Sequence, residues 1–432
     1  MSIPVQSPTT LPRRQFLQGT GLLGLALAAG VAPAFAQGVA PSNRVRVGVI
    51  GLGRGMDHVT ALLQVPGAVV AAVCDVDERR RDAAAKKVEE KSGVRPAGVV
   101  DLRRMLEDRE IDAVSIATPN FWHAPATILA CRAGKHVYVE KPGSHNAHEG
   151  ERMVEVAAST RRLVQMGTQR RSTDTVRQAI DELRAGIIGP VRMARCRYDN
   201  ARETIGRGKS APVPAWLNYE LWQGPVPERP YVDNLVHYNW HWRWHWGGGE
   251  LANNGPHALD IARWGLGVEY PHRVTANGGR YHFQDDQETP DTLTAHFEFK
   301  TCGIGWDGSS CHPRKADGVH FVTFYGDVGT LAVDASGGYR IVDPAGKEIR
   351  KVTGRTSDVP HFANFIEAIR GNTALNAPVA EGVKSVHLCH LGNIAWRSTG
   401  AVEVDPVNGR LKSAGRKQKS LWTREYRRGW SV

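Results

Sequence analysis

The run RVRVGVIGLGRG at residues 44–55 joins a strand to a glycine-rich turn. The strand is wholly apolar over residues 47–50, as parallel strands buried on both faces are. Such turns occur without ligands, but between a strand and a helix their backbone amides can approach a pyrophosphate. The third glycine of the dinucleotide fingerprint would fall on Met56, so Gly55 must serve one residue early. The turn predicts a dinucleotide site formed by Gly51, Leu52, Gly53, Arg54 and Gly55.

Strand and helix patterns alternate after this turn. Apolar strands at residues 68–73, 111–117 and 136–139 are separated by helical stretches at residues 77–91 and 127–133. This alternation predicts a doubly wound parallel sheet, a Rossmann domain, over residues 43–166.

Asp75 lies 22 residues after Gly53, at the end of the second strand. A carboxylate there accepts hydrogen bonds from the adenosine ribose hydroxyls, although a helix cap or turn residue is the alternative. Because it repels a 2′-phosphate, the carboxylate favours NAD. Arg79, Arg80 and Arg81 follow closely and keep NADP as an alternative.

The pattern changes after residue 166. Strands such as residues 294–300 and 320–325 alternate apolar with polar side chains, as in an antiparallel sheet with one covered face. Helical segments at residues 362–369 and 382–399 follow. We expect a second α/β domain at residues 167–400, with a large, mostly antiparallel open sheet. The basic tail at residues 401–432 is interpreted as a solvated extension.

The N-terminus has the features of an export signal over residues 1–36. Arg13 and Arg14 precede an apolar Gly/Ala/Leu stretch, and a small-residue cleavage site follows at residues 34–36. The paired arginines resemble a twin-arginine signal, although Pro12 and Gln18 depart from that motif. We therefore expect a periplasmic protein. Beyond residue 40 no apolar run approaches the ~20 residues of a membrane helix, so no span is expected in the mature form.

Composition narrows the range of partners. The net charge of +11 fits an anionic partner, but it is partly local to the tail, and no zinc-finger spacing or RNA-binding signature accompanies it. Nucleic acid is therefore not expected. The six cysteines lack CxxC spacing and are predicted to be free thiols, with a Cys302–Cys311 pair left open.

Two further motifs carry a family resemblance. Residues 117–120 (ATPN), His123 and residues 133–142 (AGKHVYVEKP) strongly resemble the Gfo/Idh/MocA oxidoreductase family, and residues 247–257 (GGGELANNGPH) extend the resemblance into the second domain. The resemblance implies a nicotinamide cofactor, a sugar or polyol substrate and a homo-oligomer, a dimer or tetramer. It adds to the cofactor site Thr118, Pro119, Asn120, His123, Glu140 and Lys141.

The resemblance also implies that Lys141 reaches the substrate hydroxyl and that His257 accepts its proton. Removing a hydride from an alcohol carbon requires a base for the hydroxyl proton; histidine titrates near neutrality, whereas lysine needs a lowered pKa. Asn253 shares a helix face with His257 if the helix has begun there, with Pro256 in its first turn. The family more often has aspartate at 253, and asparagine cannot take a proton. The alternatives are a cap for Asn253 and a core histidine for His257.

The run WHWRWHW at residues 240–246 alternates aromatic and polar residues. As a strand it would place four indoles on one side, where they could stack on sugar rings or pack in the core. His241 and His245 would then lie about 13 Å apart, too far to share a metal ion, so no metal site is expected. The weaker substrate candidates are Gln169, Arg170, His241, Trp244 and Asn254, with His237 and Tyr238 as further pocket residues.

Export affects the expected mechanism. The periplasm has no pool of free nicotinamide cofactor, so the cofactor should be loaded before export and stay bound. Its hydride must then return to a second sugar, or to the same substrate after elimination and hydrolysis of a glycoside, as in related NAD-dependent glycosidases. Lys141 favours the oxidoreductase. The pair of Lys141 and His257 disfavours a non-catalytic sugar-binding protein.

Overall fold

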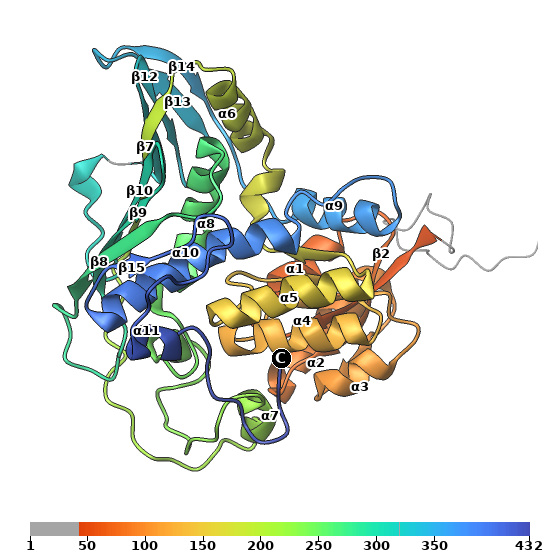
Figure 1. Cartoon of the computed structure of the whole chain (residues 1–432). Helices are drawn as coiled ribbons and strands as arrows, with labels where there is room; N and C mark the ends of the chain where they lie inside the picture. Colours follow the sequence, from red (N-terminus) through yellow and green to blue (C-terminus); the bar gives the residue numbers. More distant parts are fainter. Residues whose placement is uncertain (1–42, 319) are drawn as a thin grey trace, which may run out of the picture. The chain divides into compact units, whose positions relative to one another are not determined.

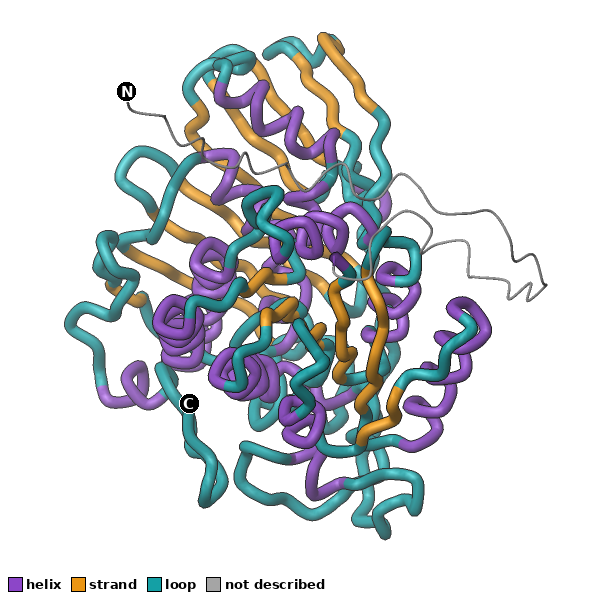
Figure 2. The backbone as a smooth tube through the Cα atoms, turned by 90° about the vertical axis from the view of Figure 1, so that its right-hand side faces the viewer, coloured by secondary structure: helices purple, strands orange, loops and turns teal. Residues whose placement is uncertain are grey.

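The computed structural model describes residues 43–318 and 320–432 (Figure 1). The predicted signal at residues 1–36 lies outside the described residues. The described chain forms two sheets that share no strand, and Figure 2 shows their strands as separate groups. The predicted fold class, a Rossmann domain followed by an α/β domain with a large, mostly antiparallel sheet, is confirmed.

The first sheet is parallel throughout, with strand order β3-β2-β1-β4-β5-β6. Its strands are β1 (Val45–Ile50), β2 (Ala68–Cys74), β3 (Ala97–Val99), β4 (Ala113–Ile116), β5 (His136–Val139) and β6 (Val164–Met166). The order reverses between β1 and β4, and ligands of such sheets bind outside the carboxyl ends of the strands at that point. The glycine turn that follows β1 is therefore at the expected place for a dinucleotide.

The helices of this domain are α1 (Gly55–Leu62), α2 (Glu78–Ser92), α3 (Leu102–Glu107), α4 (Asn120–Arg132) and α5 (Ala147–Thr160). Side chains of Asp77, Asp101 and Asn146 accept backbone N–H groups at the starts of α2, α3 and α5, as N-caps do. Helix α4 begins seven residues before the predicted start, because Pro125 inside the helix interrupts the sequence pattern.

The second sheet of the described chain has nine strands in the order β14-β13-β12-β11-β7-β10-β9-β8-β15. They are β7 (Val191–Asp199), β8 (Arg273–Gly279), β9 (Thr292–Glu298), β10 (Gly303–Ser309), β11 (Val322–Gly326), β12 (Gly329–Val333), β13 (Tyr339–Val342), β14 (Glu348–Val352) and β15 (Val402–Glu403). Only β7 and β10 pair in parallel. The sheet is therefore the open, mostly antiparallel one that the alternating pattern predicted.

Helices α6 (Asp174–Arg184), α8 (Gly249–Leu266) and α10 (Val379–Ser398) lie alongside this sheet (Figure 1). Leu251 and Leu259 of α8 pack with buried strand residues such as Phe297 and Phe324. Helix α9 (Val359–Ile369) instead packs on the Rossmann domain, where Phe362 stacks on Tyr138. The remaining short helices are α7 (Tyr219–Gln223) and α11 (Arg416–Ser420), with 3-10 turns η2 (Gln169–Ser172), η3 (Asn239–Trp242) and η4 (Lys315–Asp317).

The prediction of a strand at residues 240–246 is wrong. Residues 239–242 form the 3-10 turn η3, and the amides of Trp246 and Gly247 both bond the carbonyl of Arg243, so the chain turns again. Trp240 and Trp246 pack into a cluster with Phe121 and Trp222. Each of these indoles packs separately, because the segment is irregular and not a strand. An alternation of aromatic and polar residues in the sequence cannot distinguish this arrangement from one face of a strand.

The interpretation of residues 401–432 as a solvated extension is also wrong. Arg424 pairs with Glu149, which is 0% exposed, at 2.6 Å, and donates to the Phe121 carbonyl at 2.7 Å. Pro125 cannot donate to that carbonyl within α4, so the tail supplies the missing donor. The Trp430 ring packs edge-to-face on Trp122. The prediction of a solvated tail relied on its positive charge and did not consider its aromatic side chains or these buried partners on the Rossmann domain.

Other sequence expectations concern cysteines and membrane helices. All six cysteines are free, so Cys302 and Cys311 do not pair. Over residues 43–318 and 320–432, every helix is too short or too polar to cross a membrane.

Arg424→Ala tests how firmly the tail is held. The substitution leaves the buried Glu149 carboxylate without its charged partner and the Phe121 carbonyl without this donor, so we expect a loss of roughly 3 kcal/mol of unfolding free energy. Urea unfolding monitored by tryptophan fluorescence measures it, with Arg428→Ala, an exposed tail residue, as control. Equal midpoints for the two variants would contradict the described docking.

Candidate active site

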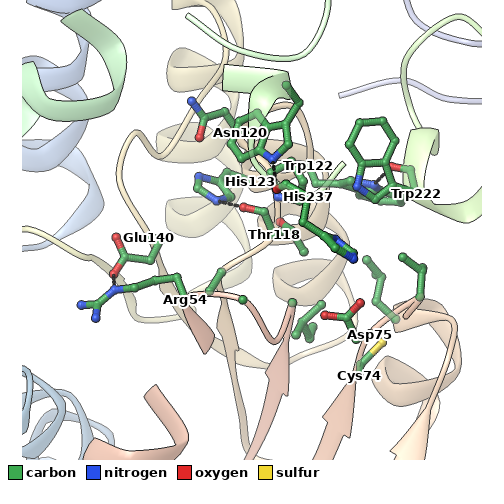
Figure 3. A pocket seen from close by; sticks show the side chains of 18 of the residues that line it. Arg54, Cys74, Asp75, Thr118, Asn120, Trp122, His123, Glu140, Trp222 and His237 are labelled. Carbon is green, nitrogen blue, oxygen red and sulfur yellow. Dashed lines mark hydrogen bonds and ion pairs between the residues drawn. The ribbon is translucent and has the colours of Figure 1, made fainter. Parts of the chain in front are cut away.

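A cavity of about 420 Å³ lies outside the carboxyl ends of the first sheet's strands (Figure 3). Gly51 has φ +81°, and a Cβ there would lie 2.7 Å from the backbone of Ala117. Glycine is thus required where the ends of β1 and β4 approach each other. At Gly53 a Cβ would meet only the tip of Arg80, at 2.8 Å, so this backbone is open toward the cavity. The turn and the start of α1 fit a pyrophosphate.

Asp75 has the turn role considered for it, and its position still allows the ribose role. Its Oδ2 accepts the Leu52 amide at 2.6 Å and its Oδ1 accepts the Asp77 amide at 2.9 Å, while the side chain lines the cavity. Burial raises its pKa against these hydrogen bonds. Each carboxylate oxygen can accept a second hydrogen bond, so ribose hydroxyls still fit. Arg80 lines the same end, which keeps NADP as an alternative.

The Glu140 carboxylate is buried and accepts hydrogen bonds from several neighbouring groups of the protein, so it is not a free cofactor ligand. Its Oε1 accepts from Gln169 at 2.9 Å, His58 at 3.1 Å and Arg54 at 3.2 Å, and its Oε2 accepts the Lys141 amide at 2.9 Å. Burial would raise its pKa, but the His58 hydrogen bond and the charge on Arg54 hold it well below the usual range. Figure 3 shows the Arg54–Glu140 contact. The Gln169 amide, a substrate candidate, is used in this network.

Sequence reasoning missed His58. It lies on α1 and is fully buried, with Nδ1 2.8 Å from the Ser115 hydroxyl and Nε2 toward Glu140. The only signal was indirect, because a buried glutamate in an EKP turn needs a donor from some neighbouring element.

Lys141 connects the two domains. Its Nζ donates to the Asn253 carbonyl at 2.7 Å and lies 3.4 Å from the Asn253 amide oxygen. Burial lowers its pKa, and although Glu140 opposes the shift, the charge of Arg54 adds to it. Both residues line the cavity. The structure thus places a lysine with a lowered pKa beside Asn253.

Helix α8 carries Asn253 and His257 on one face, but not as expected. It begins at Gly249, so Asn253 is no cap and Pro256 lies inside the helix rather than in its first turn. The glycines at residues 247–249 concealed this early start. Burial and the charges of Arg170 and Lys141 hold the His257 pKa well below its usual value. Its Nδ1 is buried without a partner among the described residues.

His241 is a second neutral imidazole, and it lines the cavity. Its Nδ1 lies 2.6 Å from the Tyr238 carbonyl, which can only accept, so Nδ1 carries the proton and Nε2 has the free lone pair. The ring stacks on Trp240 with centroids 3.6 Å apart. Burial, reinforced by the charge of Lys141, lowers its pKa to about 3.

The other predicted residues divide between cavity and scaffold. Those that line the cavity are Gly51, Gly53, Arg54, Asp75, Thr118, Pro119, Asn120, His123, Glu140, Lys141, His237 and Tyr238. Leu52 and Gly55 lie behind the turn. Trp244 packs against Trp396 and Arg397, and the Asn254 amide is bonded to Glu250, so neither faces the cavity.

The ring of His123 is also occupied by the protein. Its Nδ1 lies 2.6 Å from the Pro142 carbonyl and its Nε2 lies 2.7 Å from the Thr118 carbonyl. It therefore braces two turns that line the cavity. Cavity residues that sequence reasoning did not name include Trp122, Leu221 and Trp222. Over residues 43–318 and 320–432, no group of three His, Cys, Asp or Glu side chains could hold a metal ion.

Two family models match the chain. The model described as oxidoreductase family, NAD-binding Rossmann fold, matches residues 45–168, and that described as oxidoreductase family, C-terminal alpha/beta domain, matches residues 205–432, more than half of the chain. The chain belongs to the Gfo/Idh/MocA oxidoreductase family. The first of these models describes an NAD-binding Rossmann domain, and its range includes the glycine turn and Asp75.

Curated relatives within and around this family include glycosidases and dehydrogenases. A glycosyl hydrolase family 109 protein of Saccharopolyspora erythraea is 37% identical over 158 residues, 33% of this chain and 34% of the relative. Inositol 2-dehydrogenase 4 of the same organism is 35% identical over 170 residues, 38% of this chain and 48% of the relative. The chain thus spans about a third to a half of these relatives.

Solved structures share the fold. The WlbA dehydrogenase of Bordetella pertussis, in complex with NADH and UDP-GlcNAcA, has a TM-score of 0.63 and 20% identity, covering 84% of this chain and 99% of that one. The aldose-aldose oxidoreductase of Caulobacter crescentus, complexed with glycerol, has a TM-score of 0.65 and 19% identity, covering 84% and 100%.

The two glycines of the turn give separable predictions. Gly53→Ala adds a methyl group toward the cavity, so we expect normal melting but at least tenfold less dinucleotide released on denaturation, because the amides can no longer approach a pyrophosphate. Gly51→Ala strikes backbone at a positive φ and should lower the melting temperature as well. Mass spectrometry of the released cofactor and calorimetry measure the two effects. Full dinucleotide content in Gly53→Ala would exclude this turn as the phosphate site.

Proposed function

We propose that the protein removes a hydride from a hydroxyl-bearing carbon of a sugar or polyol and passes it to a nicotinamide cofactor that it retains. The observation that carries this proposal is the position of Lys141 Nζ at the cavity that begins at the glycine turn: it donates to the Asn253 backbone carbonyl at 2.7 Å and lies 3.4 Å from the side-chain amide oxygen of Asn253. A proton-accepting amine and a hydroxyl-orienting amide, from different domains, thus meet at a dinucleotide crevice.

Bound NAD supplies the hydride acceptor. The chain's own residues must then bind the hydroxyl and take its proton. A neutral Lys141 amine can accept this proton, and the Asn253 amide can orient the hydroxyl. His241 lines the cavity and has a pKa of about 3, so at pH 7 its neutral ring suits hydrogen bonding to a hydroxyl better than storing a proton. His257, one turn of α8 after Asn253, has a pKa well below its usual value and is not among the residues that line the cavity, so it does not suit the proton-acceptor role expected for it.

Enclosure of the cavity supports cofactor retention. Residues 216–241 of the second domain cross the adenosine end, where the Asn218 amide bonds the Val76 carbonyl at 3.0 Å and the Glu78 amide bonds the Trp216 carbonyl at 3.2 Å. His237 Nε2 lies 2.8 Å from Asp77. Opening this side of the cavity would break several contacts at once, which should make cofactor release slow.

Retention is consistent with the N-terminal signal. We propose export by the twin-arginine route to the periplasm, with the cofactor loaded before transport. This rests on Arg13, Arg14 and the cleavage motif at residues 34–36.

Lys141→Ala tests the catalytic assignment. We expect the variant to keep its dinucleotide but to lose roughly a hundredfold or more in the rate at which a sugar or polyol panel reduces the bound cofactor, measured by NADH absorbance in single turnover. Wild-type activity in Lys141→Ala would refute the role.

The pH profile of the same reaction gives a second readout. The rate should rise with pH as the neutral amine forms, and level off below the ordinary lysine value of 10.5 because burial lowers the pKa. Lys141→Arg stays protonated and should lose this rise.

A second candidate is net cleavage of a glycoside through transient oxidation. The curated relatives named glycosyl hydrolase family 109 protein favour it. Cleavage also needs a base for the C–H bond acidified by the adjacent carbonyl, and His241, whose pKa is about 3, is too weak for that role.

A chromogenic N-acetylhexosaminide separates the two functions. Release of the chromophore without added cofactor would support cleavage. Persistent reduction of the bound cofactor without chromophore release would support net oxidation.

We also propose a homo-oligomer, a dimer or tetramer, formed through the second sheet. Its strands expose Met193 and Tyr325, 37% and 39% accessible, on one face. Light scattering of the purified protein measures its order.

A further inference from the structure

The last residues of the chain, 424–432, contact both walls of one end of the cavity. In Figure 1 they run down from α11, turn back beside α7 and end near α4. The end of the cavity that they contact lies beside Asp75, whose amide bonds the Val99 carbonyl at the end of β3, and Asp101 and Leu102 line it. Because the Asp75 carboxylate suits the adenosine ribose, the adenine of a bound dinucleotide belongs at this end.

The two walls of this adenine end come from different domains. Trp122 of α4 belongs to the Rossmann wall, and Leu221 and Trp222 of α7 belong to the wall from the second domain. The indole N–H of Trp122 donates to the Trp222 carbonyl at 2.9 Å, so the two walls are in direct contact. A dinucleotide can leave past this end only after the walls have separated.

Arg427 holds the tail to the wall from the second domain. Its backbone amide donates to the Pro225 carbonyl at 2.9 Å, and its guanidinium pairs with Glu220 at 3.1 Å and with Glu228. Glu220 lies in α7, and the other two partners follow that helix. One side chain of the tail thus contacts the segment that forms this wall on both sides of the end of α7.

Trp430 holds the same tail to the Rossmann wall. Its ring packs edge-to-face on Trp122, with centroids 5.1 Å apart, and the Arg103 guanidinium of α3 lies 5.6 Å from the centre of a Trp430 ring. The Trp430 amide bonds the Arg427 carbonyl at 2.9 Å, so the contacts with the two walls belong to one turn of the chain. Arg424 anchors this turn to α4 through the Phe121 carbonyl. Separating the walls therefore requires the tail to give up its contacts with one of them.

We propose that Trp430 and Arg427 are positioning residues of the cofactor site, which hold the two walls of the adenine end together and so slow the release of the bound dinucleotide. This rests on the proposed function, in which the cofactor is retained between turnovers. Both side chains act through the wall residues, because neither of them lines the cavity. The contacts that must break before a ligand leaves determine how slowly it dissociates, and the tail adds such contacts to both walls.

Exchange of the bound dinucleotide tests this role. Cofactor-loaded protein is mixed with an excess of isotopically labelled NAD well below its melting temperature, and mass spectrometry after desalting gives the labelled fraction with time. Protein purified without dinucleotide is loaded with NAD first. We expect exchange to be roughly tenfold faster or more in Trp430→Ala and in Arg427→Ala. Trp430→Phe keeps an aromatic ring against Trp122 and should exchange at close to the wild-type rate, as should Arg428→Ala, which removes an exposed neighbour of Arg427.

A destabilised control separates a role in retention from a loss of stability. Ile341→Ala removes side-chain volume from the buried core of the second sheet, at a position that does not line the cavity, so it should lower the melting temperature and leave the exchange rate unchanged. Wild-type exchange rates in the two alanine variants of the tail, or an equal acceleration by Ile341→Ala, would overturn the inference. Neither result depends on cofactor reduction, whose absence with every sugar would count against the proposed function instead.

Discussion

Burial of one carboxylate, that of Glu140, organises the site. A charge removed from water must be matched by donors, and the chain brings them from four elements: Arg54 from the glycine turn, His58 from α1, Gln169 from η2 and the Lys141 amide from its own turn. These contacts fix the Lys141 backbone relative to the glycine turn. They also set the position of Arg170, one residue beyond Gln169.

The second constraint is the junction between the domains. Lys141 reaches from the Rossmann domain to the Asn253 carbonyl on α8, and Phe121 and Trp122 of α4 pack with Trp222 and other aromatic residues of the second domain. The C-terminal tail adds Arg424 and Trp430 behind the same helix. Because the cavity lies at this junction, its shape depends on packing between segments more than a hundred residues apart.

Much of the fold followed from local patterns. The run at residues 44–55, the apolar parallel strands and the alternating strands after residue 190 express burial on two faces or one, which is visible residue by residue. The prediction failed where burial came from distant partners. The tryptophans at residues 240–246 pack separately in a coiled segment, and residues 401–432 find a buried glutamate and an unpaired carbonyl on the Rossmann domain.

The sequence alone determined the order of the two domains, the dinucleotide turn and the presence of an EKP lysine, because these depend on spacing and side-chain period within short stretches. Only the tertiary structure decided that the Glu140 carboxylate and the Gln169 amide bond each other, that His241 presents a lone pair to the cavity, and that Arg170 lacks a carboxylate. Hydrogen-bond satisfaction is a property of the neighbourhood in space. It cannot be read from a chain whose contacting residues are far apart in sequence.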